Sequence, residues 1–460
     1  MNYVIIGNSA AAAGAIESIR RHDLQGSITV VSNEKEHIYS RPLIAHYLAG
    51  EVEEDRMPYR PFDFYETNGV ETLLGVTVTG IDPVAKELRT DNGIINYDRL
   101  LITTGSKAAV PPLKGLDLEG VSPFQTYEQA KALKAKLFPG VKAVVIGAGL
   151  IGMRAAYGLH EAGAEVTIIE LLPRILSRVL DEKGSGAVQK VLERGGLKIL
   201  TGRKVEELTG ENGKLTGLIL DDGQKLEPQI AIIATGVAPD LDLLQGTTIS
   251  TNQGILVNQY FQTNYADIFA AGDVAETHDI PRQRSMVNAN WPNAHQQGRY
   301  AGNCMAGQMT PYEGSLGMNS VSFFGVPVVS LGLFDPEIEG EENAEVKTKE
   351  IPDHNIYTKM VFKDNRLKGA IFIGDLHFCG AVKELIRDQM LVGIIKDSII
   401  DEKYQLYAFL RKKRQEDLEG RNITWPETHS STRPYVKAFN EESWTERERD
   451  KREWKEVKSQ

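Results

Sequence analysis

A repeat within the chain constrains its fold more than any other feature of the sequence. A short apolar segment ends in Gly7 and leads into a helical stretch, and the same device returns at Gly147. Four landmarks recur in one order and at nearly constant offsets: Gly7 and Gly147, Glu34 and Glu170, the turns that begin at Asp91 and Asp221, and the strand ends at Thr104 and Thr235. Two related α/β nucleotide-binding units are therefore expected in the 460 residues.

The second unit carries a complete glycine fingerprint, with Gly147, Gly149 and Gly152 in the spacing G-x-G-x-x-G. The first glycine makes the turn, the second lets backbone approach a pyrophosphate, and the third packs helix on strand. The helix that begins there presents its N-terminus to the phosphates. This pattern predicts a dinucleotide site.

Glu170 ends the second predicted strand of this unit, where it can accept hydrogen bonds from a ribose 2′-hydroxyl and would repel a 2′-phosphate. The residue therefore favours NAD over NADP. Arg174 lies nearby in the sequence, and a flexible guanidinium there could tolerate the extra phosphate, whereas a surface arginine would have no such role.

The fingerprint of the first unit is degenerate, because small residues stand where its second and third glycines belong. Ser9 and the alanines that follow still permit a close approach of backbone, though less freely than glycine. The distance in sequence from Gly7 to Glu34 is within the usual range for a ribose contact. A solvated carboxylate in a turn is the alternative interpretation of Glu34.

Charge and cysteine content exclude several function classes. The 52 basic and 63 acidic residues give a net charge of -11, which argues against binding nucleic acid or an anionic membrane. No apolar run approaches the roughly 20 residues of a membrane span. The two cysteines, Cys304 and Cys379, are far apart in the sequence, so neither an iron-sulfur cluster nor a catalytic disulfide is expected in this chain, and no metal site. A reducing, cytoplasmic location is expected.

Residues 263–274 (TNYADIFAAGDV) resemble the second FAD signature of the pyridine nucleotide-disulfide oxidoreductase superfamily, and the resemblance covers roughly residues 1 to 400. It implies that the first unit holds FAD and that the second is an inserted NAD domain. It also implies that Asp273 accepts a hydrogen bond from the flavin ribitol. Without the neighbouring motifs, Asp273 would pass for a helix cap.

Within this superfamily the chain is most similar to the disulfide-free branch, the NADH-dependent reductases of rubredoxin, nitrite and oxygenase ferredoxins. Residues 39–43 (YSRPL) lack the nearby cysteine of disulfide-using or single-cysteine relatives. The resemblance implies that Arg41 and Pro42 lie against the flavin. Residues 291–298 (WPNAHQQG) resemble the helix that starts beside the flavin, whose N-terminus would stabilise negative charge there. Trp291 is expected over the isoalloxazine or nicotinamide, with a buried core tryptophan as the alternative.

The sequence departs from this branch at two positions. Oxygenase-linked reductases typically have a lysine and a glutamate facing the flavin and nicotinamide, and here those positions hold His46 and Arg154. The ion pair of the branch is therefore replaced. We hypothesise that His46 lies near flavin N5 and tunes electron or proton transfer, against the alternative of an ordinary surface or core histidine.

The predicted fold class is α/β, with two Rossmann-like dinucleotide-binding domains for FAD and NAD, a small α+β C-terminal interface domain and a charged tail. The boundaries are residues 1–118 and 241–315 for the FAD domain, 119–240 for the NAD domain, 316–400 for the interface domain and 401–460 for the tail. The candidate catalytic residues are His46 and Trp291. The candidate residues for FAD are Gly7, Ser9, Ala10, Ala11, Glu34, Arg41, Pro42, Val78, Thr103, Thr104, Gly105, Gly272, Asp273 and Ala294, and those for NAD are Gly147, Gly149, Leu150, Ile151, Gly152, Glu170, Ala234, Thr235 and Gly236.

The C-terminal third is expected to begin with a small mixed sheet that has a turn at residues 363–366, followed by a helix from about Ala381. By family analogy such a domain dimerises or docks a partner. Three of the four tryptophans, Trp425, Trp444 and Trp454, lie in the charged tail. Because tryptophan is favoured in interfaces, the tail is predicted to wrap a partner subunit.

These patterns predict an NAD(H)-dependent FAD oxidoreductase that exchanges hydride between nicotinamide and flavin. Since the chain has no cluster or dithiol, single electrons are expected to pass to or from an iron-sulfur protein or subunit. Several flavoprotein subunits of anaerobic iron-sulfur assemblies look similar. One alternative is an NADH oxidase or peroxidase, against which the missing cysteine near Arg41 argues. The other is a flavoprotein whose nucleotide binding regulates association, as in apoptosis-inducing flavoproteins.

Overall fold

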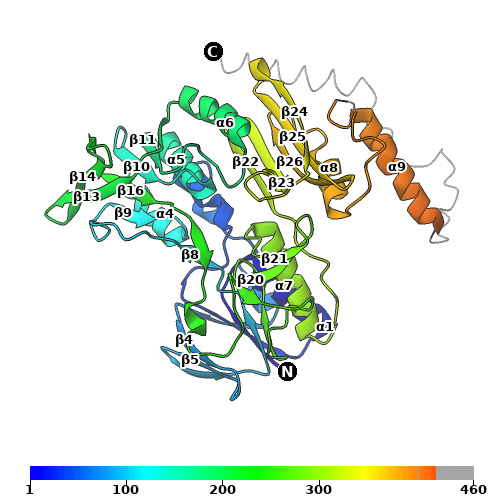
Figure 1. Cartoon of the computed structure of the whole chain (residues 1–460). Coiled ribbons are helices and arrows are strands. Elements are labelled where there is room, and N and C mark those ends of the chain that lie inside the picture. The colour runs from blue at the N-terminus through cyan, green and yellow to red at the C-terminus, as the bar shows by residue number, and fades with distance from the viewer. Residues whose placement is uncertain (402, 421–460) are drawn as a thin grey trace, which may run out of the picture. The chain divides into compact units, whose positions relative to one another are not determined.

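The computed structural model describes residues 1–401 and 403–420 of the chain (Figure 1). These residues belong to two compact units, Met1–Lys403 and Tyr404–Gln460. Of the second unit, the structure describes residues 404–420, which belong to helix α9 (Lys403–Gly420). The three tail tryptophans that predicted a partner interface lie outside the described residues.

A five-stranded parallel sheet forms the centre of the first nucleotide-binding domain. Its order is β19-β7-β1-β2-β3, with bounds β1 Asn2–Ile6, β2 Ser27–Ser32, β3 Val70–Leu74, β7 Arg99–Ile102 and β19 Ile268–Ala270. Val4 and Ile5 of β1 are fully buried, as a continuous apolar run in a parallel strand predicts. Because β19 pairs with β7, this domain is built from two parts of the chain that the second domain separates.

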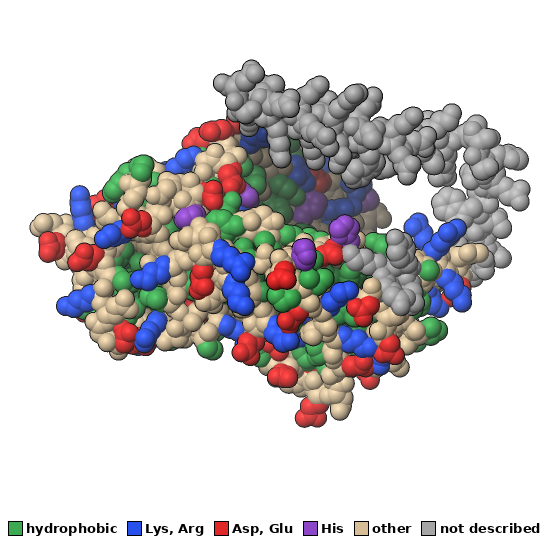
Figure 2. All heavy atoms as spheres, turned by 90° about the horizontal axis from the view of Figure 1, so that it is seen from above, with side chains coloured by type: hydrophobic (Ala, Val, Ile, Leu, Met, Phe, Trp, Pro, Cys, Tyr) green, Lys and Arg blue, Asp and Glu red, His purple; other side chains and the backbone are tan. Residues whose placement is uncertain are grey.

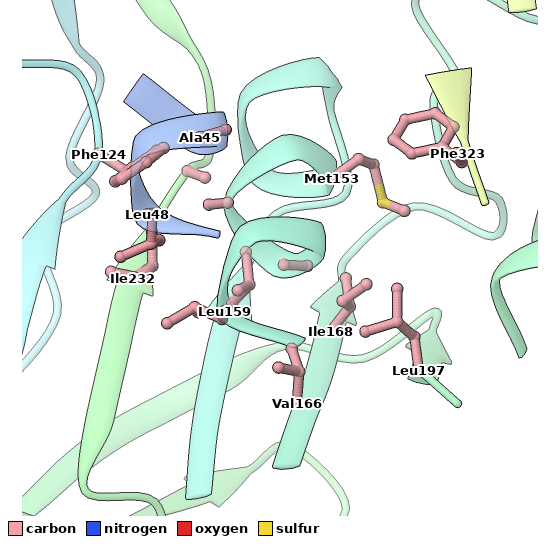
Figure 3. Close-up of a cluster of buried hydrophobic side chains, with 14 of the residues drawn as sticks. Ala45, Leu48, Phe124, Met153, Leu159, Val166, Ile168, Leu197, Ile232 and Phe323 are labelled. Atoms are coloured by element: carbon pink, nitrogen blue, oxygen red, sulfur yellow. The ribbon is translucent and has the colours of Figure 1, made fainter. Parts of the chain in front are cut away.

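The second domain repeats this arrangement with the sheet order β12-β11-β10-β16-β9, again wholly parallel. The bounds are β9 Val121–Pro123, β10 Lys142–Ile146, β11 Glu165–Glu170, β12 Lys198–Thr201 and β16 Ile230–Ile233, with helices α4 Tyr127–Lys134, α5 Leu150–Glu161 and α6 Glu182–Arg194. Leu159 of α5 packs with Ile168 and Ile232 of the strands, and Ala45 and Leu48 of helix α2 (Ile44–Leu48) join the same core (Figure 3). Helix α2 of the first domain therefore packs on the nucleotide-binding helix of the second.

The two glycine turns have nearly the same geometry, which confirms the repeat at the backbone level. Gly7 has φ +106° and donates its N–H to the carbonyl of Val31 at 2.8 Å, while Gly147 has φ +107° and donates to Ile169 at 2.8 Å. A side chain at either glycine would place Cβ only 2.3 Å from a carbonyl oxygen of the neighbouring strand end. Only glycine fits both the positive φ and the close approach.

Each dinucleotide-binding domain also carries a three-stranded antiparallel sheet. In the first domain it comprises β4 Val78–Asp82, β5 Glu87–Thr90 and β6 Gly93–Asn96, and in the second β13 Val205–Glu211, β14 Lys214–Leu220 and β15 Lys225–Leu226. The predicted turns at Asp91 and Asp221 connect β5 to β6 and β14 to β15. The linkers between the two domains pair with each other as β8 Ser106–Ala108 and β17 Val237–Pro239.

The C-terminal domain holds a five-stranded sheet of order β22-β23-β26-β25-β24. Its bounds are β22 Met318–Phe323, β23 Val326–Gly332, β24 Glu345–Ile351, β25 Ile356–Lys363 and β26 Arg366–Ile373, followed by helix α8 Cys379–Arg387. The prediction of a mixed sheet was wrong, since every strand pair is antiparallel. The short turns between β22 and β23, β24 and β25, and β25 and β26 each force the chain to reverse, whereas a parallel pair needs a long crossover. The expected turn at residues 363–366 is present, with Asp364 and Asn365 at positive φ.

The remaining elements connect or cover these sheets. They are α1 Ala10–His22, α3 Phe64–Thr67, α7 Trp291–Met305, β18 Ile255–Leu256, β20 Ala275–Asp279 and β21 Arg284–Met286, with 3₁₀ turns at Arg41–Leu43, Glu54–Arg56, Asp242–Leu244 and Pro352–His354. Among the described residues, none of the helices combines the length and the apolar character that crossing a bilayer requires. Acidic and basic side chains are interspersed over the visible part of the face in Figure 2.

Candidate dinucleotide sites

A cavity of about 700 Å³ opens at the carboxyl ends of β1, β2 and β7 in the first domain. Its lining comes from segments far apart in the sequence, including residues 6–11, 31–34, 76–79, 103–107 and 271–273. Ligands bind in this position, beyond the carboxyl ends of the strands, in open parallel α/β sheets. The sheet topology thus brings the separate sequence motifs of the first unit to one cavity.

One end of the cavity meets the N-terminus of α1. Ser9 is the N-cap residue with extended backbone, and its side chain makes no capping hydrogen bond. The first turn of α1 contains no acidic residue. Its free N–H groups and the helix dipole favour an anionic group there.

Glu34 belongs to a polar cluster at the cavity wall. Its carboxylate accepts a hydrogen bond from the Tyr39 hydroxyl at 2.7 Å and pairs with the Arg41 guanidinium. Arg41 also donates to the carbonyl of Gln125 at 3.0 Å. Since these contacts fix the carboxylate in the cavity lining, the alternative of a solvated turn carboxylate does not hold.

Asp273 faces the same cavity from the turn between β19 and β20. Burial raises the pKa of this carboxyl to about 6, and Arg41 acts in the opposite direction. No helix begins at Asp273, so it is not a helix cap. A carboxylate that lines a cavity in this way is a strong acceptor for a hydrogen bond from a ligand hydroxyl.

Helix α7 begins at the cavity. Asn290 caps it by accepting the N–H of Asn293 at 2.9 Å, and Pro292 occupies the first turn. Trp291 lines the cavity, is only partly buried, and meets Tyr59 edge-on with ring centroids 5.0 Å apart. Trp291 is therefore not a core tryptophan, and whether it contacts a flavin or a nicotinamide stays a prediction.

The cavity gathers most of the candidate residues for FAD. The predicted residues that line it are Gly7, Ser9, Ala10, Ala11, Glu34, Arg41, Val78, Thr103, Thr104, Gly105, Gly272, Asp273, Ala294 and Trp291. Pro42 and His46 are not part of the lining. Their proposed contacts with a flavin stay predictions.

His46 contacts two charged residues. Its Nδ1 pairs with the Glu51 carboxylate and its Nε2 with the Arg154 guanidinium. A guanidinium only donates, so Nε2 accepts and the proton of a neutral His46 lies on Nδ1. The Tyr157 hydroxyl donates to Glu51 at 3.0 Å. His46 and Arg154, which are predicted to replace the lysine and glutamate of the branch, are thus in contact, and Glu51 adds a carboxylate to the same group.

The second domain holds its fingerprint in the predicted geometry. An added Cβ at Gly149 would meet nothing within 4 Å, whereas at Gly152 it would lie 2.0 Å from the Gly147 carbonyl oxygen. The carboxylate of Glu170 accepts the N–H of Ala148 at 2.6 Å and that of Leu172 at 2.8 Å. The open face at Gly149 allows the close approach of a ligand, and Glu170 is fixed beside it.

Arg174 is not a free surface arginine. Its guanidinium pairs with Asp335 of the C-terminal domain at 3.2 Å, and its Nε is buried without a hydrogen-bond partner among the described residues. Because its guanidinium is already paired, Arg174 gives less reason to expect that the site tolerates the 2′-phosphate of NADP.

Sequence reasoning missed part of the cavity wall. Gln125 and Thr126 reach it from the loop before α4, and Lys107 reaches it from β8, where it pairs with Asp242. Lys107 closely follows the Gly105 landmark, which is the one signal that pointed to it. Gln125 carries no such signal, because only the fold brings it to Arg41.

The described residues contain no cluster of three or more histidine, cysteine, aspartate or glutamate side chains suited to a metal ion. Both cysteines are free, and neither lines the cavity. Burial raises the pKa of the Cys304 and Cys379 thiols. Raised thiol pKa values keep these groups protonated and poorly nucleophilic.

The cavity and the second fingerprint fit two dinucleotides. FAD contains a pyrophosphate, which fits the turn at Gly7 and the N-terminus of α1. It also carries sugar hydroxyls, from which Glu34 and Asp273 can accept hydrogen bonds. The fold and these sites define a flavin- and nicotinamide-dependent oxidoreductase with two Rossmann-like domains.

The sequence profile of the pyridine nucleotide-disulphide oxidoreductase family matches residues 1–298, and that of the rubredoxin NAD+ reductase C-terminal domain matches residues 318–390. The chain belongs to the pyridine nucleotide-disulphide oxidoreductase family. The predicted family, the α/β fold class and the cofactors FAD and NAD are confirmed. The predicted domain boundaries stay predictions.

Two relatives and one solved structure illustrate the family. The chain is 33% identical over 391 residues to the NADH-dependent phenylglyoxylate dehydrogenase subunit epsilon of Aromatoleum evansii, covering 84% of this chain and 91% of the relative. It is 32% identical to the nitrite reductase [NAD(P)H] of Bacillus subtilis over 81% of this chain, and spans 45% of that relative's length. The covalent putidaredoxin reductase-putidaredoxin complex shares the fold, with a TM-score of 0.79 at 23% identity over 85% of this chain and 94% of that one. Other relatives are named rubredoxin-NAD(+) reductase and NADH oxidase.

Proposed function

We propose that this protein exchanges hydride between NAD(H) and its FAD, and single electrons between that FAD and an iron-sulfur protein or subunit. The chain belongs to a family of NAD(H)-dependent flavoprotein oxidoreductases.

The observation that carries the proposal is the pair of dinucleotide sites without a redox dithiol beside them. The cavity lining contains no cysteine, and Cys304 and Cys379 lie outside it with raised thiol pKa values. When bound, FAD supplies two-electron hydride chemistry with a nicotinamide and one-electron chemistry with a metal centre. Electrons that reach the flavin therefore have no thiol acceptor among the described residues, which supports an external partner.

The chain's own residues would hold the cofactor as follows. The Gly7 turn and the N-terminus of α1 would bind the pyrophosphate. Glu34 and Asp273 would accept hydrogen bonds from sugar hydroxyls, and Arg41 holds the Glu34 carboxylate in place. Trp291 lines the cavity and would pack against the bound cofactor. Positioning of the two reactants is the main contribution that the protein makes to hydride transfer.

The relatives' names support a metal-containing partner. One relative is a subunit of an NADH-dependent dehydrogenase, and others are named for rubredoxin or ferredoxin reduction. We infer that this chain serves an equivalent electron-transfer role, with the net direction set by its partner. A homodimer through residues 316–400, a partner bound by the tail, and a cytoplasmic location stay predictions.

The acceptor is tested by anaerobic assays of NADH oxidation with a purified ferredoxin, with rubredoxin, or with neither. We expect reduction of an iron-sulfur or iron-thiolate protein at a rate far above that of oxygen uptake in air. Oxygen reduced faster than any iron protein would make the protein an NADH oxidase. Flavin that NADH does not reduce, together with a nucleotide-dependent change in oligomeric state, would favour the binding-module alternative.

A further inference from the structure

The second domain carries an arginine just after β12, the strand next to β11, whose end holds the carboxylate that is predicted to bind a ribose. Strand β12 pairs with β11 so that Thr201 stands opposite Glu170. Gly202 turns the chain with φ +65°, and the backbone N–H of Arg203 donates to the Glu170 carbonyl at 2.9 Å. The Arg203 side chain therefore starts at the same edge of the sheet as the Glu170 carboxylate.

An aspartate from another element pairs with this arginine. The Arg203 guanidinium lies 3.1 Å from the Asp222 carboxylate, which belongs to the turn between β14 and β15. That turn is itself fixed, because Asp221 donates its N–H to the Lys204 carbonyl at 2.9 Å and the second oxygen of Asp222 accepts the N–H of Gln224 at 2.9 Å. The side chains of Arg203 and Asp222 remain 42% and 33% exposed, so the pair borders open space rather than the core.

The Arg203–Asp222 pair matters for the choice between NAD and NADP. NADP differs from NAD only by a phosphate on the adenosine 2′-oxygen. A guanidinium is the preferred protein partner of phosphate, because it offers several N–H donors in a planar fork. An unpaired arginine beside Glu170 would offset the repulsion that this carboxylate exerts on the phosphate.

We propose that Asp222 is a specificity-determining residue that withholds the Arg203 guanidinium from a 2′-phosphate, so that two carboxylates rather than one select NAD(H). This inference rests on the proposed NAD(H) site of the second domain. Arg174 is held in the same manner by Asp335. Arg174, after the end of β11, and Arg203, after the end of β12, are thus each paired with a carboxylate from elsewhere in the fold.

The test measures binding of NAD+ and NADP+ to the FAD-loaded full chain by isothermal titration calorimetry, so that no flavin reduction contributes heat. Asp222→Asn should lower the dissociation constant of NADP+ about threefold to fivefold, the range expected for one partly exposed charge pair. The dissociation constant of NAD+ should stay within about twofold. The double variant Asp222→Asn with Arg203→Gln should return NADP+ binding to the wild-type value.

Glu206→Gln is the matched control. Glu206 pairs with Lys204, the neighbour of Arg203, at 2.9 Å, and both side chains are exposed. Its removal deletes one negative charge near the same strand end and should leave NADP+ binding unchanged.

Three outcomes would overturn the inference. Asp222→Asn could leave NADP+ binding unchanged, or Glu206→Gln could strengthen it equally. The gain could also persist without Arg203, in which case the lost negative charge alone explains it. A wild-type chain that binds no NAD+ would overturn the proposed function on which the inference rests, and this outcome is separate from the other three.

Discussion

The packing of α1 on α7 offers a sharp test, because the two helices meet through backbone rather than side chains. A Cβ at Gly298 of α7 would lie 1.9 Å from the carbonyl oxygen of Ala11 in α1, whereas ordinary contacts of this kind measure 3.4–4 Å. Neither atom belongs to a flexible side chain. Gly298→Ala therefore forces the helices apart by about 1.5 Å, which forfeits a large part of the dispersion energy along their contact.

We expect this substitution to cost about 3 kcal/mol, the upper end of what overpacking usually costs, of which alanine's helix propensity returns about 1 kcal/mol. The net loss in the free energy of unfolding is about 2 kcal/mol. Because Ala11 lines the cavity, FAD should also dissociate more readily. Urea unfolding followed by tryptophan fluorescence, and FAD retention on gel filtration, measure the two effects.

Gly186→Ala is the matched control for Gly298→Ala. Gly186 is an exposed residue of α6, and an added Cβ would meet nothing within 4 Å. This variant should be more stable than the wild type by up to about 1 kcal/mol. Gly298→Ala with wild-type stability, or equal effects of the two substitutions, would refute the account of the α1–α7 contact.

Four further predictions concern the sites. Asp273→Asn should stabilise the FAD-free protein at pH 8 by about 3 kcal/mol. Folding raises the pKa of this carboxyl from 3.8 to about 6, so its ionisation costs stability that grows above about pH 4 and is complete above about pH 6. The difference should therefore vanish below about pH 4 in urea unfolding at each pH. Glu170→Ala should raise the dissociation constant of NAD+ about tenfold in calorimetry, since a hydrogen bond to a charged acceptor is lost, and unchanged affinity would contradict the ribose assignment. His46→Gln should change the flavin reduction potential and the hydride-transfer rate, and unchanged values of both would end the hypothesis that His46 tunes transfer. Truncation after residue 402 should release the partner subunit, and an unchanged mass of the complex would refute a role for the tail.

The repeat was predictable because it rests on backbone requirements that few residues satisfy. Gly7 and Gly147 combine positive φ with a carbonyl oxygen 2.3 Å from an added Cβ. Such positions leave a mark in the sequence at fixed offsets, and so do the acidic residues at the ends of β2 and β11. The candidate residues that follow these landmarks accordingly gather at one cavity in the first domain.

Partners that only tertiary structure brings together could not be predicted. Gln125 meets Arg41 across 84 positions and Asp335 meets Arg174 across 161, with no local pattern to indicate either contact. The contact of His46 with Glu51 is local in sequence, but it depends on how the chain turns after α2. The C-terminal sheet was wrongly expected to be mixed. Apolar periodicity locates strands but does not show their directions, which depend on the turns between them.

The most direct test of the central claim is an anaerobic titration of the purified, FAD-loaded protein with NADH and, separately, with NADPH, following the visible absorption of the flavin. The account predicts that one equivalent of NADH bleaches the flavin rapidly, while NADPH does so slowly or at far higher concentration. Flavin that neither nucleotide reduces would contradict hydride exchange between the two sites. Equal reduction by both nucleotides would contradict the selection of NAD(H) by Glu170.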